Sequence, residues 1–97
     1  MNKQFLDYKI NINLIDILNV LEVSPNQFLS VNNNNLNIND IFINDFVPFK
    51  DLKENSLSFL NNTKYDFNKI NTGLCILEKK NIIFLNKKVI KIPFENP

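Results

Sequence analysis

The sequence predicts a single small α/β domain, with a mixed sheet of about five short strands and two short helices. Three observations indicate this class. The length of 97 residues suits one domain but not two. Hydrophobic residues make up 44% of the chain and include nine Phe, which is ample for a core. Apolar runs of strand length alternate with two segments of helical character, and no internal repeat is visible.

A short strand and a helix come first. Ile10 and Ile12 alternate with Asn residues, which is the pattern of a half-buried strand. Apolar residues then recur every three or four positions over residues 14–21, as on one face of an amphipathic helix. Asn13 can cap this helix at its start, and the pair Ser24-Pro25 predicts its end.

Extended segments and turns are predicted next. Residues 28–31 predict a short strand that leads into a turn at Asn32–Asn35, because Asn tolerates the left-handed backbone region. Residues 36–43 are predicted to be extended. Residues 46–55 contain Pro48 and a polar run, which favours a loop or a single helical turn.

The C-terminal half begins with a strand and a turn. Residues 56–60 alternate as a strand and run into a polar turn at 61–65. A short helix carrying Phe67 and Ile70 follows, and Gly73 ends it.

Three more strands are predicted, over residues 74–77, 82–85 and 89–92. The continuous apolar run 74–77 is typical of a strand covered on both faces, so Cys75 is expected to be a core residue. A single cysteine cannot form an internal disulfide, which indicates a reducing compartment. The start of the chain lacks the apolar core of a signal peptide, and no apolar run approaches the roughly 18 residues of a membrane span. We therefore expect a soluble cytoplasmic protein.

The charged and reactive residues exclude several functions. Eleven Lys, no Arg and ten acidic residues leave a net charge of +1, so electrostatic binding of nucleic acid is not expected. The chain has no His, which excludes triads, His-activated nucleophiles and zinc sites of His and Cys. Its single glycine, Gly73, excludes a glycine-rich phosphate loop. No catalytic residue, metal or cofactor is expected in this chain.

One segment resembles a family signature. The run from Ser56 to Tyr65, Ser-Leu-Ser-Phe-Leu-Asn-Asn-Thr-Lys-Tyr, resembles the isFlxNxKY motif of UDP-3-O-acylglucosamine N-acyltransferases, which act in lipid A biosynthesis. The motif belongs to their N-terminal domain. The early helix, the run 41–49, the strand 72–77 and the late strand leading to Asn96-Pro97 are similar in spacing to that domain, so the resemblance covers nearly the whole chain.

The resemblance implies a uridine-binding domain over residues 1–97. In that family the motif's aromatic residues sandwich uracil and its Asn contacts the base edge, which implies these roles for Phe59, Tyr65 and Asn62. Aromatic stacking on a base is worth about 1 to 3 kcal/mol, and an amide offers both a donor and an acceptor. Lys64 is a further candidate, for the pyrophosphate of a UDP-GlcNAc-type nucleotide sugar.

The same resemblance implies an N-acyltransferase as the parent protein. Its left-handed β-helix, which carries the catalytic His and forms a homotrimer, has no counterpart in these residues, so this chain would be a monomeric domain that positions the nucleotide. Acyl carrier protein, the acyl donor, would be bound only by the other domains.

Two alternatives stay open. One is a stand-alone interaction or structural domain on the same scaffold, in which Phe59 and Tyr65 are core aromatics that flank a turn. The other is the UDP-binding domain of a cell-wall ligase, which shares a similar small fold, although no extended motif of that kind is present.

Overall fold

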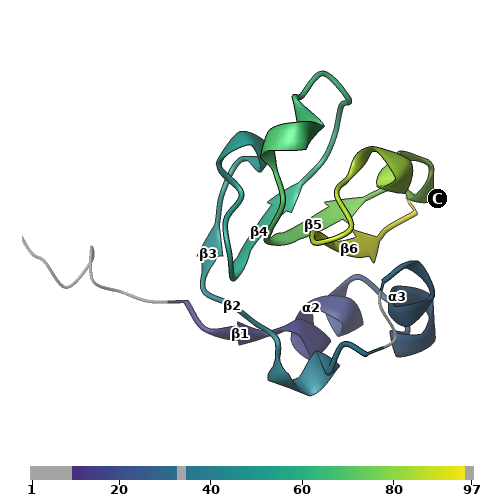
Figure 1. Ribbon diagram of the computed structural model, residues 1–97. Coiled ribbons are helices and arrows are strands. Elements are labelled where there is room, and N and C mark those ends of the chain that lie inside the picture. The colour runs from purple at the N-terminus through teal and green to yellow at the C-terminus, as the bar shows by residue number, and fades with distance from the viewer. Residues whose placement is uncertain (1–9, 33–34, 96–97) are drawn as a thin grey trace, which may run out of the picture.

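The computed structural model describes residues 10–32 and 35–95 (Figure 1). Within these residues, two α-helices, six strands and four short 3-10 helices follow one another. In chain order they are β1 (Ile12–Asn13), α2 (Leu14–Val20), α3 (Pro25–Val31), η1 (Ile38–Asp40), β2 (Phe42–Ile43), β3 (Asp45–Phe46), η2 (Phe49–Asp51), β4 (Ser56–Phe59), η3 (Phe67–Lys69), β5 (Leu74–Leu77), η4 (Lys79–Phe84) and β6 (Ile90–Pro93).

The strands form two small sheets. β1 and β2 pair antiparallel, whereas β3, β4, β5 and β6 form a sheet in that order, with every neighbouring pair parallel. In Figure 1, α2 and α3 lie together beside this larger sheet. The predicted α/β class and its two short helices are thus confirmed, with the strands divided between a parallel sheet and an antiparallel pair.

Each face of the parallel sheet is covered by its own core cluster. Side chains alternate between the faces of a strand, so Leu57 and its register partner Leu74 point to one side and Ser58 and Cys75 to the other. The first cluster joins the sheet to α2 and α3, and consists of Leu14, Leu18, Val23, Phe28, Ile43, Leu57, Leu74 and Ile92. The second lies on the opposite face, under the connecting segments, and consists of Phe49, Leu52, Leu60, Ile70, Cys75, Leu77, Leu85 and Val89.

The first predicted helix is confirmed as α2. Its N-cap is Asn13, whose side-chain oxygen accepts a hydrogen bond from the backbone N–H of Ile15. Leu14 and Leu18, one turn apart, are buried in the first cluster. The helix ends at Val20, and Glu22 in the following turn has a positive φ of 58°.

The predicted strand at 28–31 is wrong, because these residues belong to α3. Ser24 and Gln27 form a capping box, in which each side chain accepts a hydrogen bond from the other residue's backbone N–H. Pro25 is the first residue of α3, where its missing N–H costs nothing. The pair Ser24-Pro25, predicted to end the first helix, therefore starts the second, and α2 has already ended at Val20.

Two other extended predictions are corrected. Residues 82–85 were predicted as a strand, but η4 covers Lys79–Phe84 and Ile83 is 84% exposed. Within 36–43, η1 interrupts the extended pattern, because the side chain of Asn37 accepts a hydrogen bond from the N–H of Asn39. In both segments the apolar residues are present, but they do not form a continuous buried face.

Most of the remaining elements agree with the sequence, but Phe46, predicted to lie in a loop, ends the short strand β3. Strands over 56–59, 74–77 and 90–93 are confirmed, as are helical turns at η2 and η3. The prediction that Gly73 ends the short helix is wrong, because η3 ends at Lys69 with Ile70 as its C-cap. Gly73 instead precedes β5 with a φ of +94°, and a Cβ there would lie 2.5 Å from Cγ of Leu52, so both conformation and space require glycine. The predicted Asn turn includes residues 33 and 34, which lie outside the described residues.

Asn32 pairs with the outer edge of β6. Its amide nitrogen donates to the carbonyl of Lys91 at 2.6 Å, and its amide oxygen accepts from the N–H of Lys91 at 2.8 Å. The side chain thus makes the two bonds that another strand would make. Two residues further along, Pro93 has no N–H to offer. This edge of the parallel sheet is therefore closed to a further strand.

The Asn32→Ala substitution is expected to lower the free energy of unfolding by about 1 to 3 kcal/mol, because it leaves two backbone groups of β6 without their partners. Urea unfolding followed by circular dichroism measures the change. Asn71→Ala, at an exposed loop position, is the matched control. Equal stability of the two variants would contradict a role for the amide at the edge.

The buried Cys75 thiol makes stability depend on pH. Burial raises the pKa of Cys75 from 9.0 to about 11. As the pH rises, the unfolded chain therefore loses the thiol proton before the folded chain does. The thiol's contribution to the free energy of unfolding is complete below pH 9, and about 3 kcal/mol of it is lost as the pH rises towards 11. Burial lowers the pKa of Lys91, which acts in the opposite direction because the folded chain binds that proton less tightly.

Comparison of wild type with the Cys75→Ala variant isolates the effect of the thiol on stability, because both proteins contain Lys91. We expect the stability difference between wild type and variant to be constant at lower pH and to shrink between pH 9 and 11. Urea unfolding at several pH values checks this. A difference that stays constant to pH 11 would show that Cys75 ionises as easily in the folded chain as in the unfolded one.

Candidate functional site

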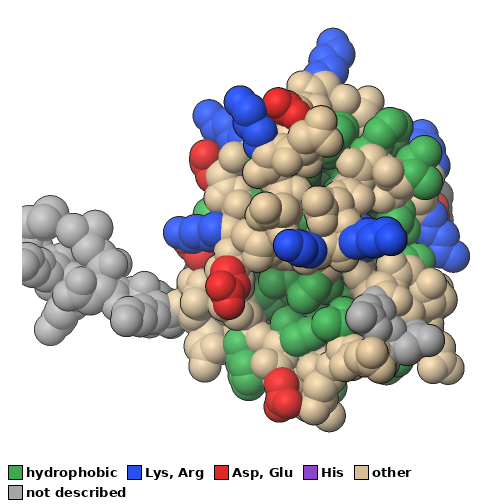
Figure 2. Space-filling model, viewed as in Figure 1, with side chains coloured by type: hydrophobic (Ala, Val, Ile, Leu, Met, Phe, Trp, Pro, Cys, Tyr) green, Lys and Arg blue, Asp and Glu red, His purple; other side chains and the backbone are tan. Residues whose placement is uncertain are grey.

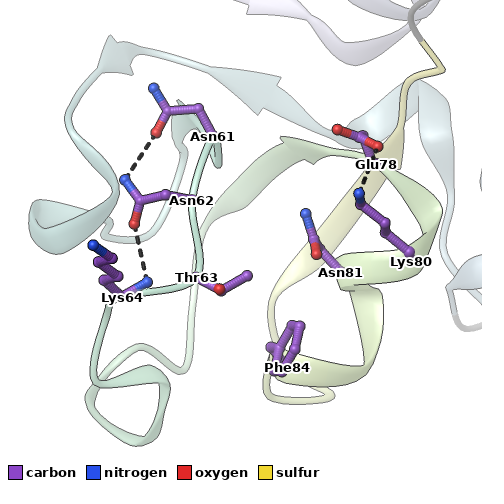
Figure 3. A pocket seen from close by; sticks show the side chains of 8 residues that line it. All are labelled: Asn61, Asn62, Thr63, Lys64, Glu78, Lys80, Asn81 and Phe84. Atoms are coloured by element: carbon purple, nitrogen blue, oxygen red, sulfur yellow. Dashed lines mark hydrogen bonds and ion pairs between the residues drawn. The ribbon is translucent and has the colours of Figure 1, made fainter.

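A pocket of about 490 Å³ lies at the carboxyl edge of the parallel sheet. Its two walls are the loop that leaves β4 and the segment that leaves β5, which includes η4 (Figure 3). β4 and β5 are adjacent and parallel, so both segments emerge at the same edge, where α/β sheets commonly bind ligands. The lining residues are Asn61, Asn62, Thr63, Lys64, Glu78, Lys80, Asn81 and Phe84.

The loop wall is shaped by the side chain of Asn62. Its amide oxygen accepts from the backbone N–H of Lys64 at 3.0 Å, and its amide nitrogen donates to the side-chain oxygen of Asn61 at 3.2 Å (Figure 3). The first bond closes a tight turn of the kind that Asn favours. The amide retains one N–H and one lone pair with which it can contact a ligand.

The η4 wall carries an aromatic ring and a second amide. Phe84 is 43% exposed, and its ring is stacked on Phe67 with centroids 5.5 Å apart and planes inclined by 19°. Asn81 lies between Phe84 and the Glu78–Lys80 ion pair, whose charged atoms are 3.6 Å apart (Figure 3). Thr63 extends from the loop towards this wall.

The charges around the pocket suit a small anion better than an extended one. Lys64 and Lys80 line it together with a single carboxylate, Glu78. Lys64 has no ion-pair partner within residues 10–32 and 35–95. On the face shown in Figure 2, Lys and acidic side chains are scattered, without an area of one sign. Because Lys80 is already paired with Glu78, Lys64 is the lysine of this pocket that is available to an anion.

Two of the predicted site residues, Asn62 and Lys64, line this pocket, whereas Phe59 and Tyr65 lie beside it. Phe59 ends β4 on the sheet face that packs against α2 and α3, and it is 54% exposed. Tyr65 packs into the cluster of the opposite face, with its ring 4.9 Å from Phe49 and 6.3 Å from Phe67. The two rings thus flank the carboxyl edge from opposite faces of the sheet.

Asn81 and Phe84 were missed by sequence analysis, because residues 82–85 were predicted as a strand. One signal in the sequence points to them. The polar run Glu78-Lys79-Lys80-Asn81 directly follows the buried strand 74–77, and residues just beyond the carboxyl end of such a strand are often ligand contacts.

Other kinds of site find less support. Within residues 10–32 and 35–95, no group of three or more His, Cys, Asp and Glu side chains is placed to hold a metal ion. No helix in the same part of the chain is long and apolar enough to cross a membrane. The pocket at the carboxyl edge is therefore the candidate site.

Comparison with known proteins identifies no relative: no protein-family model, no curated protein and no solved structure matches the chain. The resemblance to the N-acyltransferase signature therefore depends on the residues of the sequence alone.

The turn at Asn62 can be tested without a ligand. Asn62→Ala removes the acceptor for the Lys64 N–H, a bond worth about 0.5 to 1.5 kcal/mol, so the Lys64 amide is expected to exchange about 2- to 12-fold faster with solvent. Hydrogen exchange measured by NMR gives this rate. The amides of β4 and β5 serve as internal controls, and acceleration throughout the sheet would instead indicate global destabilisation.

Proposed function

We propose that this chain is the nucleotide-binding module of a UDP-3-O-(3-hydroxyacyl)glucosamine N-acyltransferase of lipid A biosynthesis, and that it holds the uridine of a UDP-GlcNAc-type sugar. One observation carries the proposal. The loop that contains the signature residues Asn62 and Lys64 lines a pocket at the carboxyl edge of a parallel sheet. Its volume of about 490 Å³ lies in the range of small-molecule sites.

The pocket offers the groups that a uridine nucleotide needs. Uracil presents carbonyl acceptors and an N–H donor, which the free N–H and lone pair of the Asn62 amide can match. The ammonium group of Lys64 is a flexible point charge suited to a diphosphate. Of the aromatic residues at this edge, Phe59 is 54% exposed and is therefore available for stacking.

Stacking of uracil between Phe59 and Tyr65 restricts where the base can lie. Phe59 and Tyr65 flank the sheet from opposite faces, so a base held between them would lie across the carboxyl edge. Tyr65 already packs on Phe49 and Phe67, so that only an edge or one face of its ring is left for contact with a ligand. The roles of Phe59, Asn62 and Tyr65 at uracil are part of the proposal.

In this proposal the chain binds substrate and leaves the chemistry to other domains. A chain without His cannot supply the His base of the parent reaction. Binding energy from a remote uridine nevertheless contributes to rate, because it orients the glucosamine amine at a distant catalytic centre. Acyl carrier protein, trimer formation and a cytoplasmic location belong to the same proposal.

Titration of the ¹⁵N-labelled chain with UDP-GlcNAc tests the proposal. We expect saturable chemical-shift changes centred on residues 59–65 and 78–84, and an affinity about 5- to 150-fold weaker in Phe59→Ala, because one stacking contact is lost. Two-dimensional NMR spectra give both the site and the dissociation constant.

The matched control is Phe42→Ala, since Phe42 is 40% exposed and belongs to the other sheet. Its affinity should equal that of wild type. Absence of any shift at millimolar UDP-GlcNAc would contradict the proposal and favour an interaction domain that binds no nucleotide.

A further inference from the structure

We infer that Phe84 and Asn81, on η4, form the wall of the pocket that contacts the base. Phe84 supplies the stacking face and Asn81 the amide that pairs with the edge of the pyrimidine. This inference rests on the proposed function and names further specificity-determining residues of the same site. The signature motif contains neither residue, and the argument for them comes from the geometry of η4.

The 3-10 helix places these side chains on one side. A 3-10 helix has three residues per turn, so residues three apart stand one above the other. Glu78, the N-cap of η4, is followed at this spacing by Asn81 and then Phe84, and all three line the pocket (Figure 3). The helical turn therefore presents a carboxylate, an amide and an aromatic ring in a row towards the loop of β4.

Phe84 is anchored from behind by other rings. It stacks on Phe67, which meets Phe49 edge-on with centroids 5.6 Å apart, and Phe49 is only 2% exposed. This chain of contacts connects the Phe84 ring to the second core cluster. The exposed part of the ring borders the pocket, where a base can extend the existing stack.

Tyr65 is placed differently. Its ring is in contact with both Phe49 and Phe67, and it borders a separate cavity of about 120 Å³ together with Lys50, Asp66, Lys69 and Ile70. Phe84 lines the larger pocket directly, whereas Tyr65 does not. The structure therefore favours Phe84 over Tyr65 as the ring that a base meets inside the pocket.

Asn81 has the chemistry to pair with the base edge. Its side-chain amide has no hydrogen-bond partner among the residues that the structure describes, while its backbone N–H is used in the turn, donating to the carbonyl of Glu78 at 3.0 Å. The amide is therefore free to present both a donor and an acceptor to a pyrimidine. Lys64 lines the same opening, has no ion-pair partner among the described residues, and is suited to the phosphates, whereas Lys80 is paired with Glu78.

Direct contacts between ligand and rings test the inference. In the complex of wild-type chain with UDP-GlcNAc, we expect intermolecular nuclear Overhauser effects from the uracil C5 and C6 protons to the ring protons of Phe84. The wild-type protein is used, so this readout does not depend on whether any variant folds. Contacts to Phe59 and Tyr65 alone would overturn the inference and leave the proposed function intact.

Affinity provides a second readout. Phe84→Leu should weaken UDP-GlcNAc binding about 5- to 150-fold, whereas Phe42→Leu, at a position of similar exposure outside the pocket, should leave it unchanged. Asn81→Ala should weaken binding about 2- to 12-fold, with Asn68→Ala on η3 as its control.

The outcomes separate the two proposals. Unchanged affinity in a folded Phe84→Leu variant would overturn the role of Phe84 while wild-type binding still supports the uridine module. A wild-type chain that does not bind UDP-GlcNAc at millimolar concentration would overturn both. Unshifted amide resonances of β4, β5 and β6 in the free variant would show that the fold is retained.

Discussion

The burial of β5 on both faces is the constraint on which the rest of the structure depends. Leu74 and Cys75 point to opposite sides of this strand, and both are buried. With parallel neighbours on each side, the strand is held by backbone hydrogen bonds at both edges and by a core cluster on both faces. The two clusters are covered by different parts of the chain. Helices α2 and α3 cover the first cluster, and the connecting segments cover the second.

The position of the pocket follows from this arrangement. Parallel strands require connections that return to the starting edge, so the segments after β4 and β5 leave the sheet together at its carboxyl end. Neither connection contains an α-helix within the described residues, and both turn through short 3-10 helices instead. The short turns leave polar side chains and Phe84 around an open pocket rather than a closed core. The pocket thus arises from how the second cluster is covered.

Asparagine has several structural roles in this chain. Asn13 caps α2, Asn32 pairs with the edge of β6, and Asn62 closes the turn beside the pocket. Each role uses the same property, an amide that can donate and accept at once and so replace a backbone partner. The cap at Asn13 and the turn at Asn62 could be predicted, because both are local relations, whereas Asn32 and Lys91 are far apart in the sequence.

The sequence by itself determined the α/β class, the helix α2, the strands β4, β5 and β6, and the buried state of Cys75, because local periodicity and continuous apolar runs report these directly. It also singled out Asn62 and Lys64, which line the pocket. The helix at 25–31 was missed although its capping box, Ser24 with Gln27, is a local signal. The tertiary structure alone decided that η4 replaces a strand and that Phe84 rather than Tyr65 lines the pocket. The physical reason is that an apolar run shows which residues prefer burial, while the partner that buries them, and the ring left exposed, depend on contacts between segments distant in the chain.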